Sequence, residues 1–141
     1  MADVIYNSFK RDIMNGSIDL DTDAINVMLV TSTYVPDQDT HTKRSNITNE
    51  VVGTGYTAGG SALTTKVVSA DNTDNEGVFD ADDVSWTTST ITARGAVLYK
   101  ARGGVATADE LICYLDFVTD KISTAGTFLI SWNAEGILNL N

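Results

Sequence analysis

The sequence contains one cysteine, one histidine and one proline in 141 residues. A single cysteine excludes a disulfide within the chain and any metal site that needs two thiolates. A single histidine likewise excludes a metal site with two histidine ligands from one chain. No apolar run approaches the roughly 18 residues that a membrane span needs. The start, Met1-Ala2-Asp3, lacks the basic and apolar regions of a secretory signal, so we expect synthesis in the cytoplasm.

Basic residues are also scarce. Nine lysines and arginines stand against nineteen acidic residues, which gives a formal net charge of −10. This charge opposes binding to phosphate backbones and to anionic lipid headgroups. The nearest approach to a basic patch is the pair Lys43-Arg44. We therefore expect neither a nucleic-acid partner nor a membrane partner.

The remaining composition is that of a globular protein, with 43% hydrophobic residues. A chain of this length fits one domain and can bury a core without metals or disulfides. We expect a single β-sandwich domain over residues 1–141. Within it, residues 1–16 form a helical segment and residues 34–49 form an extended loop, or arm.

The helical segment is identified by apolar residues that share one face of a 3.6-residue period: Val4, Ile5, Phe9, Ile13 and Met14. The pattern predicts a helix over Val4–Met14. Asp3 is the expected N-cap, and Asn15-Gly16 provides a stop signal. One apolar face means that the helix packs either on its own sheet or on a partner.

The rest of the chain consists of short β-branched and apolar runs between turn-forming residues. The expected strands are Ile25–Thr33, Ala62–Ser69, Val78–Trp86, Thr90–Lys100, Glu110–Val118, Thr127–Trp132 and Ile137–Leu140. This number and spacing predict an all-β fold, a jelly-roll-like β-sandwich with one short N-terminal helix. The expected core residues are Val27, Leu29, Val67, Val97, Leu111, Cys113, Leu115, Phe128 and Ile130.

The motifs that could carry chemistry are incomplete. Asp19-x-Asp21-x-Asp23 resembles the start of a calcium loop, but the positions that need glycine and glutamate do not have them, so an acidic turn is favoured. Gly53–Gly60 does not lead into a helix as a nucleotide loop must, and it favours a sharp chain reversal. His41 has no GxSxG elbow to accompany it. We expect no catalytic residue, no metal and no cofactor, and hence no enzyme.

Several long segments resemble one family: Tyr6–Lys10, Gly16–His41, Glu50–Gly60, Phe79–Lys100 and Ser131–Leu140. They are similar to small virion structural proteins of tailed bacteriophages, the capsid cement or decoration proteins. The resemblance implies a jelly-roll sandwich on the outside of the virion capsid. It also implies a homodimer that binds the major capsid protein and reinforces contacts between its subunits, without catalysis.

Two segments are candidates for contacting such a partner, since a self-contained sandwich makes little use of either. One is the helix, through Val4, Ile5 and Phe9. The other is the arm, through its charged residues Asp37, Asp39, Lys43 and Arg44. The alternative function is host attachment by a tail- or fibre-associated or glycan-binding β-sandwich, for which Trp86, Trp132 and Tyr56 are the candidate stacking residues.

Overall fold

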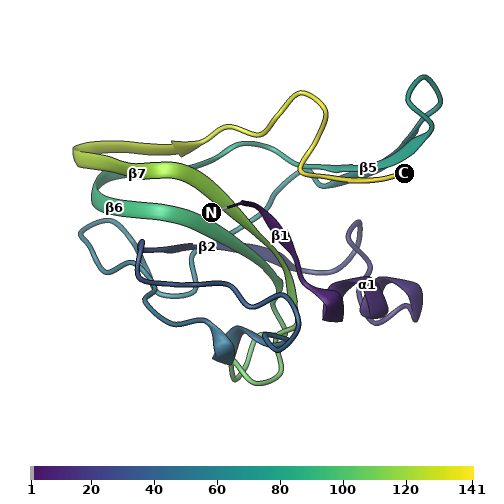
Figure 1. Ribbon diagram of the computed structural model, residues 1–141. Helices are drawn as coiled ribbons and strands as arrows, with labels where there is room; N and C mark the ends of the chain where they lie inside the picture. Colours follow the sequence, from purple (N-terminus) through teal and green to yellow (C-terminus); the bar gives the residue numbers. More distant parts are fainter. Residues whose placement is uncertain (1) are drawn as a thin grey trace.

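The structure is a computed structural model that describes residues 2–141. It contains two antiparallel sheets and one short α-helix (Figure 1). The elements are β1 (Val4–Ile5), α1 (Asn7–Met14), β2 (Ile25–Val30), β3 (Ser61–Ala62), β4 (Val67–Asp71), β5 (Glu76–Asp80), β6 (Val84–Lys100), β7 (Leu111–Ile130) and β8 (Leu138–Leu140). The larger sheet has the order β1-β7-β6-β2-β3, and the smaller sheet has the order β4-β5-β8. The predicted all-β fold is confirmed, while the jelly-roll connectivity stays a prediction.

The helix begins later than the sequence predicts. Val4 and Ile5 form β1, which pairs with Tyr114 and Cys113 of β7, and the N-cap is Tyr6 rather than Asp3. β-branched residues suit a strand, and the edge of β7 offers them hydrogen-bond partners that a helix end lacks. The predicted end is confirmed, since α1 stops at Met14, with Asn15 as its C-cap.

The centre of the fold is a long two-stranded ribbon made by β6, of 17 residues, and β7, of 20 residues. Phe117 and Phe128 both belong to β7, and eleven residues of straight strand would separate them by about 36 Å. Their ring centroids lie only 6.2 Å apart. The ribbon therefore folds back over itself at one end of the molecule, as Figure 1 shows.

The bend occurs at Thr87–Ser89, which lies between the two expected strands Val78–Trp86 and Thr90–Lys100. The register between β6 and β7 shifts on both sides of Ser89, and Thr88 has a positive φ of 51°. Inside the bend, Ser89 Oγ and Ser123 Oγ are hydrogen-bonded at 2.8 Å. The turn-forming residues thus produce β-bulges that bend a continuous strand, so the prediction of separate strands here is wrong.

The main core cluster combines buried residues of β2, β6 and β7 with Phe9 of α1 and Phe79 of β5. Seven of the nine predicted core residues are buried, and Leu115 is half-buried against them. The prediction that Val67 is a core residue is wrong, because its side chain is 50% exposed on β4 of the smaller sheet. Cys113 is buried, which raises the pKa of its thiol to about 12, so it is a core thiol as predicted. Sequence reasoning missed a second buried cluster around Tyr6, Tyr34 and Tyr114.

Candidate functional site

The arm, residues 34–49, packs on the body of the protein instead of extending from it. Tyr34 is buried, and its hydroxyl hydrogen-bonds the Tyr6 hydroxyl at 2.8 Å and His41 Nδ1 at 2.9 Å. Burial raises the pKa of Tyr34 to about 12, so the phenol stays neutral. The side chain of Gln38 also donates to the carbonyl of Ile5 at 2.8 Å. Residues 34–49 thus form the expected loop, but the loop packs on the body and does not extend from it.

The four charged candidate residues of the arm are engaged within the chain. Arg44 Nε lies 2.7 Å from Asp109 Oδ2, and Lys43 Nζ lies 3.4 Å from Glu110 Oε1. The Asp37 carboxylate accepts hydrogen bonds from the backbone N–H groups of residues 39 and 40. Asp39 accepts one from the side chain of Asn7 at 2.7 Å. The structure thus brings these residues to the helix start and to the start of β7.

The ion pair between Lys43 of the arm and Glu110 makes the attachment of the arm sensitive to acid. Its burial opposes ionisation, but hydrogen bonds from Arg102 and the charge of Lys43 outweigh burial and lower the pKa of Glu110 to about 2. A lowered pKa gives stability that is present above about pH 4.5 and is lost as the pH falls towards 2. Urea unfolding at pH 6 and at pH 2 gives the free energy of unfolding lost on acidification. We expect Glu110→Gln to lose about 1–2 kcal/mol less than the wild type. An equal pH dependence of the free energy of unfolding in the two proteins would contradict this role of Glu110.

The three candidate residues near the helix also contribute to the fold. Phe9 belongs to the main core cluster, and Ile5 is half-buried against it. Val4 is half-buried against the second cluster, which contains Tyr6. Removing residues 1–10 would remove both Phe9 and the fully buried Tyr6. Such a truncation therefore changes the stability of the domain as well as any contact with a partner.

An apolar groove of about 490 Å³ lies between α1 and the smaller sheet. Its lining residues are almost all apolar, with Lys10 as the only charged one. Several of them are exposed: Met14 by 82%, Val68 by 52% and Leu140 by 73%. We refer to this feature as the apolar groove. Sequence reasoning missed it, because the sequence places Met14 in the helix and Leu140 in the last strand without showing that the two elements meet.

The apolar wall of the groove arises because side chains alternate strictly between the two faces of the smaller sheet. Pairing in register places the residues of the inner face side by side: Val68, Ala70, Gly77, Phe79, Leu138 and Leu140. The outer face carries the residues between them: Val67, Ser69, Asp71, Glu76, Val78, Asp80 and Asn139. One face is therefore wholly apolar and the other is mainly polar and acidic.

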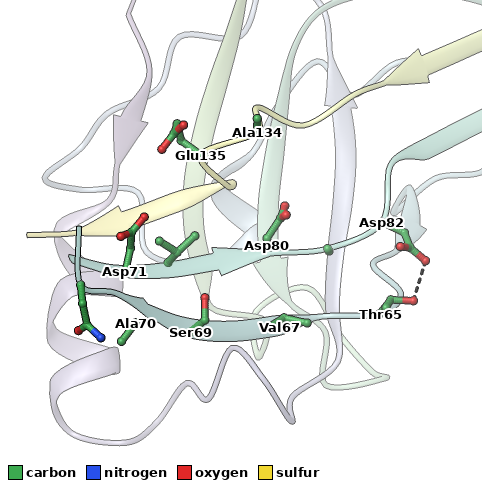
Figure 2. Close-up of a pocket in the computed structure, with 12 residues that line it drawn as sticks. Thr65, Val67, Ser69, Ala70, Asp71, Asp80, Asp82, Ala134 and Glu135 are labelled. Carbon is green, nitrogen blue, oxygen red and sulfur yellow. Dashed lines mark hydrogen bonds between the residues drawn. The ribbon is translucent and has the colours of Figure 1, made fainter. Parts of the chain in front are cut away.

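The outer face forms an acidic surface (Figure 2). Carboxylate oxygens of Asp71, Asp74 and Glu135 lie within 4.8 Å of one another. Among residues 2–141, no lysine or arginine forms a salt bridge with these three groups or with Asp80. One buried oxygen, Asp80 Oδ1, also has no hydrogen-bond partner within the described part of the chain. The acidic surface therefore carries negative charge that no salt bridge within the described residues neutralises.

The other sequence candidates have structural explanations. The Asp19–Asp23 segment is a turn, in which Asp23 accepts the N–H of Asp19 at 2.8 Å and pairs with Lys100 at 2.7 Å. Trp86 is buried against Phe128, and the half-buried Trp132 donates its Nε1–H to the carbonyl of residue 82. The two tryptophans thus form no exposed stacking pair.

Comparisons with protein-family models, with curated proteins and with solved structures found no match to this chain. Within residues 2–141, no helix has the length and apolar character needed to cross a membrane.

Proposed function

We propose that this chain is a non-enzymatic structural protein of a bacteriophage virion. It binds the outer capsid surface, as a homodimer, and reinforces contacts between major capsid subunits. The sequence resemblance described above supports the proposal. The structural observation that carries it is the apolar groove, because an exposed apolar surface of this kind is typical of a protein–protein contact site.

Such a function needs a binding surface and no chemistry. A protein that binds only the assembled shell stabilises the shell by mass action, and many copies multiply a modest contact energy. Burying one exposed leucine or methionine contributes about 1.5–3 kcal/mol, whereas an exposed ion pair contributes about 0–1 kcal/mol. We therefore assign the main contact to the groove and not to the charged arm.

The groove variants Met14→Lys and Leu140→Lys test this assignment. Both side chains are largely exposed, so we expect the domain to fold with an unchanged melting temperature. Each added charge would be desolvated in the contact, and we expect capsid binding to fall by about tenfold or more. Co-sedimentation with shells stripped of the protein measures this. Val52→Lys is the matched control, since Val52 is 97% exposed outside the groove. Equal loss in all three variants would refute the groove as the contact.

A further inference from the structure

The smaller sheet has an open edge at β4. In the order β4-β5-β8, β4 pairs with β5 on one side only. Within residues 2–141, no backbone hydrogen bond from another segment reaches its other side. Residues 67–70 are exposed, and β4 contains no proline or charged residue before Asp71. An unprotected edge of this kind is a template for an added strand.

The two faces that meet at this edge differ in chemistry. Val68 belongs to the apolar groove on one side, and Asp71 belongs to the acidic surface on the other. Negative charge is concentrated in this part of the chain, because residues 62–93 and 131–141 hold seven acidic residues and a single basic residue, Lys66. Side chains of an added strand would alternate between the two faces.

We infer that the β4 edge binds an extended segment of a partner protein in which apolar residues alternate with lysine or arginine. The backbone of the segment pairs with β4, its apolar side chains extend the inner face beside Val68, and its basic side chains lie over the acidic surface. A long basic side chain can also supply the donor that Asp80 Oδ1 lacks. This inference deepens the proposed function, on which it rests for the partner being a protein.

Charge complementarity favours this occupant over a second copy of the chain. Pairing of two β4 strands around a two-fold axis would bring two acidic surfaces together, and like charges oppose such an approach. A helix lying in the groove would cover the apolar face, but it would leave the β4 backbone and the acidic surface without partners. Strand addition satisfies the open edge and both faces together.

A set of capped peptides tests the inference on the full chain. The probe is Lys-Val-Lys-Val-Lys-Val-Lys, which alternates as the edge requires. The controls are Val-Val-Val-Lys-Lys-Lys-Lys, with the same composition in blocks, and the probe with alternate backbone nitrogens methylated. Titration calorimetry measures affinity, and amide hydrogen exchange locates the site. We expect the probe to bind and to slow exchange in residues 67–71. Both controls are expected to bind at least about tenfold more weakly than the probe.

Three results would overturn the inference. Equal binding of the block peptide would indicate non-specific charge attraction. Slower exchange in α1 and β8 without any change in β4 would indicate a ligand lying in the groove alone. Protection of β4 that rises with protein concentration in the absence of peptide would indicate that a second copy occupies the edge.

Two sets of variants separate the contributions of the two faces. Val68→Lys is expected to weaken probe binding by about tenfold, and Val52→Lys is its control. Asp74→Asn combined with Glu135→Gln is expected to reduce the salt dependence of probe binding, with Asp21→Asn and Asp120→Asn together as the control. Wild-type binding by both test variants would refute the assigned edge. If the peptide fails to bind while the protein still decorates capsids, the edge inference fails and the proposed function stands.

Discussion

Replacing Gly60 by alanine is expected to destabilise the domain by about 4 kcal/mol or more, enough to prevent folding of a marginally stable chain. Gly60 has a positive φ of 78°, and a Cβ placed there would lie 1.8 Å from the carbonyl oxygen of Val27. Val27 is fully buried in β2, so its backbone cannot move aside without disturbing the core. Urea unfolding followed by circular dichroism measures the loss, together with the yield of soluble protein.

Gly103→Ala provides the matched control. Gly103 has nearly the same backbone angle, φ 76°, but a Cβ added there would have no neighbouring atom within 4 Å. Only the backbone strain of about 1–2 kcal/mol remains at this position. Equal destabilisation of the two variants would show that the glycine-rich loop does not approach β2 as closely as the structure indicates.

Replacing Phe128 by alanine is expected to destabilise the domain by about 3–5 kcal/mol. Phe128 is buried, and its ring contacts those of Phe117 and Trp86, with centroid distances of 6.2 Å and 6.1 Å. Trp86 is the cross-strand partner of Phe128, whereas the contact with Phe117 exists only because the β6–β7 ribbon folds back on itself. Thermal and urea unfolding give the change in stability.

The adjacent Leu129 is the control for this prediction. Its side chain is 58% exposed, because alternate residues of a strand point to opposite faces. Leu129→Ala should change the free energy of unfolding by no more than about 0.5 kcal/mol. If Leu129→Ala destabilised the protein more than Phe128→Ala, the assignment of the two faces of β7 would be reversed.

The sequence predicts the local structure better than it predicts how distant segments meet. The apolar runs around Val27, Val97 and Leu111 identify buried strands because their residues are β-branched or apolar. The bend at Ser89 is not predictable in the same way, since turn-forming residues favour a chain reversal and a β-bulge alike. Which one forms depends on pairing with Ser123 and Gly126, far along the chain.

For the candidate contact sites too, the sequence predicts local features but not the contacts between distant segments. The basic residues of the arm, Lys43 and Arg44, look available in the sequence, but their partners Glu110 and Asp109 lie more than sixty residues further on. Val67 looks like a core residue within the pair Val67-Val68, although the smaller sheet leaves both about half exposed. The alternation that creates the apolar groove is present in β4, but only the pairing with β5 and β8 shows that three apolar rows share one face.

The heat resistance of virions that carry or lack this chain tests the proposed function most directly. Shells stripped of the protein, stripped shells to which wild-type protein is restored, and stripped shells given Leu140→Lys are heated in parallel, and release of packaged DNA is followed by dye fluorescence. We expect the restored shells to release DNA at a higher temperature than the stripped shells, and shells given Leu140→Lys to behave like stripped ones. Identical release temperatures with and without the wild-type protein would contradict a reinforcing role at the capsid.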